Sequence, residues 1–237
     1  MKKLLSVLSF LLVTNFIFAQ KTLKEGAITY GISDVKAKGK NAMASQMLNG
    51  TSMTMYFNES QQKVNMNMMN GMMKMQMFTN PKEKTIRSFM DMMGQKMEMT
   101  GIDSTYKYGL EHPAKVDSTA EKAKATGKTK EILGYKCDEY VVKSMVKEKE
   151  INGYIYVTKD LIVDKALWRN KEVGMIPMLD GSQVPGFPME MGMETAEMSL
   201  KMTVTKIDEK IDSKEFIIPE GYKKMDAKSM KGMRGGF

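Results

Sequence analysis

The chain has 237 residues and a formal charge of +8, with 36 lysines and arginines against 28 acidic residues. This length suffices for one sizeable β-rich domain or two small ones. The basic residues are scattered among acids and turn residues, without interleaved aromatic side chains, so we expect no nucleic-acid partner.

The composition is dominated by methionine, with 28 residues against one cysteine and one histidine. The methionines gather between Met43 and Met99 and again between Met175 and Met202. A single cysteine, Cys137, permits no internal disulfide, so the fold must be stabilised by its core. One cysteine and one histidine also disfavour a zinc site.

Residues 1–19 have the pattern of a signal peptide, because Lys2 and Lys3 precede an apolar stretch that ends at Ala19. We expect cleavage near Ala19–Gln20 and a soluble protein that is periplasmic or secreted. Loss of Lys2 and Lys3 lowers the formal charge from +8 to +6. The remaining scattered lysines indicate a solvated surface, with weak peripheral attraction to anionic lipid headgroups as the alternative. No cysteine lies at the cleavage site, so we do not expect a lipoprotein.

The first strands are predicted at residues 26–34 and 52–58, where apolar and polar residues alternate. In the second of these, Met53, Met55 and Phe57 share one face. Residues 36–50 between them are small and polar and predict a short helix or a loop.

A β-hairpin is predicted at residues 62–79 around Asn70–Gly71, because both central residues of a type I′ turn need positive φ. This turn places Met69 opposite Met72. Each residue further along the first strand then lies opposite the corresponding residue of the second, as far as Val64 opposite Met77. One face then carries Val64, Met66, Met68, Met73, Met75 and Met77. The other face carries Asn65, Asn67, Lys74 and Gln76.

Further strands are predicted at residues 84–91 and 95–100, the second with Met97 and Met99 on one face. A long lysine-rich connection follows at 101–127. Strands resume at 128–133, 136–143 and 153–158.

Residues 160–173 show helical spacing, with Asp160 as the N-cap. The proline-containing residues 174–190 are expected to be irregular or to form a rigid turn. Strands are predicted again at 191–206 and 216–218, and residues 223–237 read as a flexible basic tail.

These elements predict a single, mainly β domain over residues 20–222 with a minor helical part. About ten or eleven short strands with one polar and one apolar face describe a curved antiparallel sheet. We expect an open half-barrel with a helix packed on or near its concave face.

Three motifs resemble the exported bacterial family named domain of unknown function 4412. They are GKTKEILGYKCDEY at 127–140, VPGFPME at 184–190 and FIIPEGYKKM at 216–225, accompanied by DMMGQKMEM at 91–99. The second motif also resembles the turn of the GLPGLI family. The motif residues with an expected structural role are Gly134, Tyr135, Cys137, Pro185, Gly186, Phe187 and Pro188. The resemblance implies a LolA-like half-barrel, a group in which other members carry lipid or lipoprotein acyl chains.

No catalytic constellation is apparent in the sequence. The only histidine, His112, lies in the lysine-rich connection, and a general base needs an oriented partner. Cys137 shares a strand face with Tyr135 and Val141, which indicates a buried packing thiol. We therefore expect no enzyme activity and no cofactor.

The methionine-bearing strand faces have three interpretations, which the sequence leaves open. Methionine adapts to varied partners, so the faces can form a binding surface for a lipid, an acyl chain or another apolar ligand. The residues of that surface are Met53, Met55, Met66, Met68, Met73, Met75, Met77, Met97 and Met99.

The second interpretation is a Cu(I) or Ag(I) site, because thioether sulfurs prefer soft cations. Its ligands would be Met66, Met68, Met73 and Met75 in the predicted hairpin. The third interpretation is a structural envelope protein in which methionine fills the core in place of leucine. Neither the ligand nor the oligomeric state follows from the sequence.

Overall fold

The structure is a computed structural model. It describes residues 20–39, 42–80, 85–100, 122–146, 149–163 and 184–226. The expected signal peptide at 1–19 and His112 lie outside these ranges.

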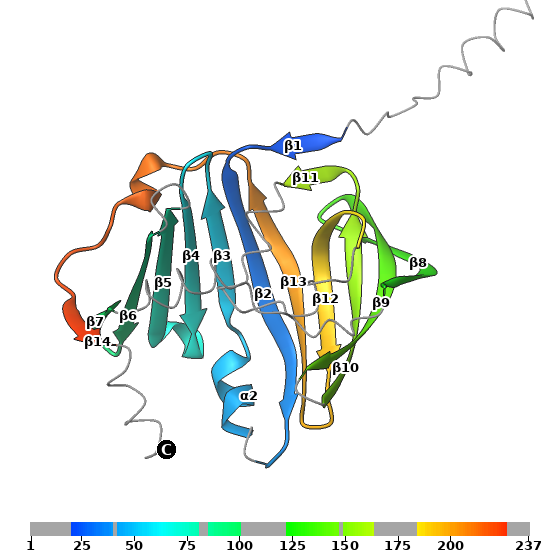
Figure 1. The fold of residues 1–237 in the computed structure, drawn as a ribbon, viewed down its shortest axis with the longest axis horizontal. Coiled ribbons are helices and arrows are strands. Elements are labelled where there is room, and N and C mark those ends of the chain that lie inside the picture. The colour runs from blue at the N-terminus through cyan, green and yellow to red at the C-terminus, as the bar shows by residue number, and fades with distance from the viewer. Residues whose placement is uncertain are drawn as a thin grey trace, which may run out of the picture.

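A twelve-stranded sheet dominates the described part of the chain, with β14 and β8 at its two edges. Figure 1 shows that the sheet is curved and that its two edges do not meet. From edge to edge the strands are β14 (Lys223–Asp226), β7 (Gln95–Thr100), β6 (Thr85–Met92), β5 (Met73–Asn80), β4 (Gln62–Met68), β3 (Ser52–Phe57), β2 (Gly26–Ala37), β13 (Met198–Asp208), β12 (Phe187–Glu194), β10 (Lys149–Thr158), β9 (Tyr135–Val146) and β8 (Lys124–Ile132).

Neighbouring strands of this sheet are antiparallel, apart from β14, which pairs in parallel with β7. A small second sheet pairs β1 (Lys21–Leu23) in parallel with β11 (Leu161–Val163). The predicted mainly β fold with an open, curved sheet is therefore confirmed.

The predicted hairpin register is confirmed pair by pair, from Val64 opposite Met77 to Met68 opposite Met73. Asn70 and Gly71 have φ of 53° and 87°, as a type I′ turn requires. Met69 also has positive φ, and residues Met69–Gly71 form the 3-10 turn η2. Strand pairing therefore ends one pair earlier than expected, and the Met72 N–H donates to the Met69 carbonyl at 3.2 Å.

Helix α2 (Ala42–Leu48) lies at one end of the strands, below β3 in Figure 1. It occupies the segment for which the sequence predicted a short helix or a loop. The helix predicted at 160–173 is wrong at its start, because Leu161–Val163 form β11 beside β1. Residues 164–173 lie outside the described part of the chain.

The predicted end of the chain also needs correction. Lys223–Asp226 form β14, although the sequence predicted a flexible tail from residue 223. Residues Ser213–Phe216 form the 3-10 turn η5, with the Asp212 side chain accepting a hydrogen bond from the Lys214 N–H. Phe187–Glu190, predicted to be irregular, belong to β12.

The core lies on one face of β2, β3 and the strands from β13 to β9. Its most deeply buried large side chains include Ile28, Tyr30, Phe57, Ile155, Phe187 and Met189. The Tyr30 hydroxyl donates to the Pro188 carbonyl at 3.0 Å, so the polar end of this buried ring is satisfied.

The motif residues lie at turns and in this core. Cys137 and Phe187 are buried in the core cluster, whereas Pro185 is exposed. A Cβ at Gly186 would lie 2.5 Å from the Thr158 carbonyl oxygen, so this close approach requires glycine.

Candidate functional site

The methionines of β3–β7 align in rows that run across the strands. The central row joins directly opposed residues on five successive strands, namely Met53, Met66, Met75, Met90 and Met97. Because opposed residues project to the same side of a sheet, their side chains share one face.

Two flanking rows continue this surface on either side. One contains Met55, Val64, Met77, Ser88 and Met99, and the other contains Met68, Met73 and Met92. We name this side of β3–β7 the methionine face. All nine methionines predicted to line an apolar surface lie on it.

Met90 and Met92 also belong to this face, although the sequence analysis did not include them. Part of their signal was available, because Met90 belongs to the strand predicted at 84–91, Met92 directly follows it, and the two flank Asp91. That strand was not assigned a face, so the two residues were missed.

Burial decreases along the central row of the methionine face as the row leaves the core. Met53 is 1% exposed beside the core, whereas Met66, Met75 and Met97 are half-buried. Met92 is 39% exposed. Thioether side chains offer weak acceptors at most, so this is an adaptable apolar surface that is not fully covered.

The other side of β4–β7 is covered by residues 212–222. Lys63 forms an ion pair with Glu215 at 2.9 Å and lies over the Tyr56 and Phe78 rings. Phe89 packs edge-on against Tyr222, with the ring centroids 5.1 Å apart.

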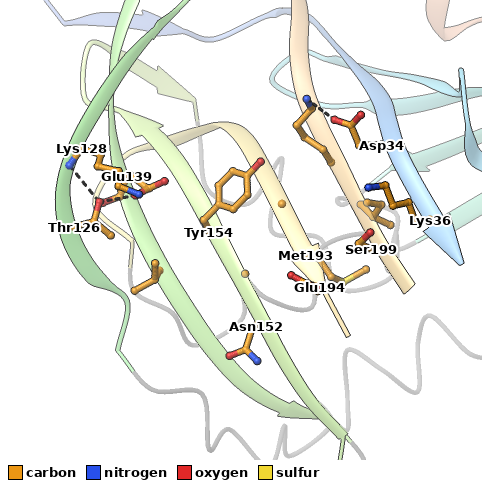
Figure 2. A pocket seen from close by; sticks show the side chains of 15 residues that line it. Asp34, Lys36, Thr126, Lys128, Glu139, Asn152, Tyr154, Met193, Glu194 and Ser199 are labelled. Carbon is orange, nitrogen blue, oxygen red and sulfur yellow. Dashed lines mark hydrogen bonds and ion pairs between the residues drawn. The ribbon is translucent and has the colours of Figure 1, made fainter. Parts of the chain in front are cut away.

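A hollow of about 560 Å³ lies on the far side of the sheet from the core, between β8 and β2. Figure 2 shows Tyr154 in its middle, with Thr126 and Glu139 on one side and Asp34 on the other. We name it the polar groove. A bulge between Ala125 and Thr129 in β8 places Thr126 within hydrogen-bond reach of Glu139.

Two buried glutamates accept hydrogen bonds in or beside the polar groove, since Glu139 lines it and Glu190 contacts the lining residue Tyr154. Glu139 accepts hydrogen bonds from Thr126 at 2.6 Å and from Tyr156 at 2.7 Å. Glu190 accepts from Thr203 at 2.9 Å and from Tyr154 at 3.2 Å. It also forms a short ion pair with Lys130.

The protonation states of this network follow from its contacts. The hydrogen bond from Thr126, followed by that from Tyr156, lowers the pKa of Glu139 below its ordinary value despite burial. Burial raises the pKa of Tyr154 to about 12, and the hydrogen bond to Glu139 does the same for Tyr156. At neutral pH the Glu139 carboxylate is an ionised acceptor, and the Tyr154 and Tyr156 phenols are protonated donors.

These glutamates therefore act as internal hydrogen-bond acceptors in the folded protein. The thiol of Cys137 is unsuited to nucleophilic attack, because burial raises its pKa to about 11. Its position agrees with the packing role expected from the sequence. The absence of enzyme activity stays a prediction.

Among the described residues, no group of three or more histidine, cysteine, aspartate or glutamate side chains could hold a metal ion. That finding does not bear on thioether ligands. No helix in the described ranges combines the length and apolar character needed to cross a membrane.

The chain belongs to the family described as Domain of unknown function (DUF4412), whose model matches residues 38–222. The family predicted from the sequence motifs is therefore confirmed. No curated protein matches the sequence.

Three solved structures illustrate the structural similarities. PNGF-II in its C2 crystal form is 14% identical over 90% of this chain, with a TM-score of 0.42, and the chain spans about a third (33%) of its length. Lipoprotein LppX from Mycobacterium tuberculosis is 10% identical over 80% of this chain and 89% of its own, with a TM-score of 0.43. LprF from Mycobacterium bovis is 6% identical over 84% of this chain and 90% of its own, with a TM-score of 0.40. Likenesses at this level carry no information about ligand or activity.

Proposed function

We propose that this DUF4412 protein is an exported, non-enzymatic binder or carrier of an apolar ligand, a lipid or lipoprotein acyl chain, held against the methionine face. The observation that carries the proposal is the central row from Met53 to Met97, which continues across five strands while its outer members stay half-buried. The proposed compartment is the periplasm or the exterior.

The choice of methionine supports a binding surface over a rigid core. Freezing a methionine side chain costs about 1.5–2 kcal/mol of rotamer entropy, against about 0.5–1 kcal/mol for leucine. A half-buried position recovers less of this cost through burial than a core position does. Side chains that stay mobile until a ligand arrives avoid most of it, and they adapt to chains of different shape.

A Cu(I) or Ag(I) site is the second candidate function, and one observation favours it. Met66 is directly opposite Met75, and Met68 is directly opposite Met73. Opposed strand residues have Cβ atoms about 4.5–5.5 Å apart, which brings their sulfurs within reach of one soft cation. A structural envelope protein with methionine as core filler is the third candidate, supported by the full burial of Met53 and Met189.

Two measurements test the apolar ligand. Native mass spectrometry of the protein purified from a lysate that contains membranes should detect a co-purified lipid. A fluorescent fatty acid should bind the purified protein and lose affinity when Met75 and Met90 are replaced by threonine. Met189→Leu, a change in the buried core, is the matched control and should leave probe binding unchanged.

A protein mass without lipid, together with no saturable probe binding, would contradict the proposal. Equal loss of probe binding in Met189→Leu would show that the effect is one of general stability.

The copper candidate has its own test. An anaerobic titration with a Cu(I) chelator as competitor should show weaker binding in the Met66→Leu/Met75→Leu variant than in the wild type. Unchanged affinity would show that the hairpin is not a copper site.

A further inference from the structure

Three exposed methionines gather at one end of the methionine face. Met72, Met92 and Met93 are 50%, 39% and 81% exposed. They lie in the two neighbouring hairpins β4–β5 and β6–β7. The Met93 N–H donates to the Met72 carbonyl at 3.0 Å, and Met92 lies opposite Met73. We name these three residues the methionine rim.

The fold itself does not favour methionine at residue 93. Met93 and Gly94 have φ of 53° and 86°, so Met93 occupies the left-handed region. Turn positions of this kind favour asparagine, aspartate or glycine. The turn is held by the Asp91 side chain, which accepts a hydrogen bond from the Gly94 N–H at 2.9 Å. A polar residue at 93 would suit both the backbone and the surrounding water better.

Basic side chains flank the methionine rim. Lys74 and Lys96 are exposed and lie on either side of Asp91 in the register of β5, β6 and β7. β14 adds exposed Lys223 and Lys224 along the edge of β7. Apolar side chains at an exposed tip, bordered by lysines, have the chemistry of a peripheral contact with an anionic bilayer.

The rim is also continuous with the methionine face. Met92 is the outer member of the row that contains Met68 and Met73. Figure 1 places the β4–β5 turn at the same end of the strands as α2, away from the small sheet of β1 and β11. An acyl chain that leaves a bilayer at the rim would therefore reach the methionine face directly.

We propose that the methionine rim inserts into the surface of an anionic lipid bilayer, and that this contact is where the apolar ligand enters or leaves. The bilayer contact stands by itself, whereas the transfer of ligand rests on the proposed function.

The chain offers a matched control at the opposite end of the sheet. Leu133 precedes Gly134 in the β8–β9 turn, has φ of 52° and is 50% exposed. It therefore shares with Met93 the turn position, the backbone conformation and the apolar exposure. Asparagine suits this conformation, so Met93→Asn and Leu133→Asn should both fold.

The test is co-sedimentation of the full chain with vesicles. Vesicles of phosphatidylcholine with about one-third phosphatidylglycerol should bind the wild type, and pure phosphatidylcholine should bind it at least about tenfold more weakly. The Met72→Gln/Met93→Asn variant should lose about tenfold or more of its affinity for the anionic vesicles. Leu133→Asn should bind them like the wild type.

Wild-type binding by the rim variant would overturn the proposal, and so would equal losses in the rim variant and in Leu133→Asn. Equal binding of the wild type to both vesicle types would overturn the anionic specificity. The fatty-acid probe in vesicle-free solution separates the two proposals. Probe binding should persist in the rim variant, because the variant leaves the methionine face intact. A wild type that binds anionic vesicles but no probe would overturn the ligand proposal and leave the bilayer contact standing.

Discussion

The two halves of the sheet use similar backbone geometry to different ends. In the central row, Met53 of β3 is followed on one side by Tyr30 of β2 and Val204 of β13, all at most 1% exposed. On the other side the row continues through Met66 and Met75, which are half-buried. The strand register is therefore continuous along the row, whereas the side chains change from buried to half-buried between Met53 and Met66.

Methionine alone does not mark this division. Met189, Met191 and Met202 are buried in the half that contains β12 and β13, where they pack with branched and aromatic side chains. On the methionine face of β4–β7, most methionines are half-buried. The comparison teaches that the burial of a methionine, and not its presence, distinguishes core filler from an adaptable surface.

The largest expected effect tests this division with one substitution made in both halves. Met189→Ala removes a fully buried side chain and should lower the free energy of unfolding by about 2–5 kcal/mol. Met75→Ala removes a half-buried side chain, so it should lower the free energy of unfolding by only about 1 kcal/mol. Urea unfolding monitored by circular dichroism measures both. Equal losses would show that the methionine face is as rigidly packed as the core.

The next effect concerns the half of the sheet formed by β13, β12, β10, β9 and β8, on the side that faces away from the core. Glu190→Gln should lower the free energy of unfolding by about 2–3 kcal/mol, because it weakens the acceptor shared by Lys130, Tyr154 and Thr203. Glu194→Gln, at an exposed position on the same strand, should change stability by no more than about 0.5 kcal/mol. Similar losses in both variants would remove the case for a structural network.

A smaller effect tests the packing of Tyr154 on the sheet. A Cβ at Gly192 would overlap the Tyr154 ring, so Gly192→Ala should cost about 1–3 kcal/mol. Tyr154→Ser removes the ring, and the double variant should be more stable than the sum of the two changes predicts. Additive costs in a double-mutant cycle would contradict this contact.

The smallest effect is a pH dependence confined to the same half. The pKa of Glu139 is lowered from its ordinary 4.5, so the ionised carboxylate stabilises the fold above that value. This contribution is lost as the pH falls through the lowered pKa. The stability difference between the wild type and Glu139→Gln should therefore shrink as the pH falls below the ordinary pKa of 4.5. A difference that grows on acidification would reverse the sign we assign.

Short-range features were the ones that could be predicted from the sequence. The register of β4 and β5 followed from Asn70–Gly71 and from alternation, because a turn and a period of two are local properties. Within each strand, the predicted surface methionines share one face for the same reason. That these strands align into one continuous face, to which Met90 and Met92 belong, depends on the pairing of β6 with β5.

Long-range pairing explains the main errors. Leu161–Val163 were predicted to begin a helix because their spacing fits one, but they pair with β1 about 140 residues earlier in the chain. Lys223–Asp226 resemble a basic tail in composition, yet they add to the edge of β7. In both cases the backbone hydrogen bonds to a distant strand outweigh the local preference.

The sequence by itself determined the family, the mainly β class and the two-faced hairpin, because motifs, turn chemistry and alternation are written in neighbouring residues. Only the tertiary structure decided which methionines are buried. Met53 and Met75 have the same local pattern, but Met53 lies beside β2 and the core, whereas Met75 lies two strands further from it. Burial depends on neighbours that are distant in the chain, so it emerges only when the strands are assembled.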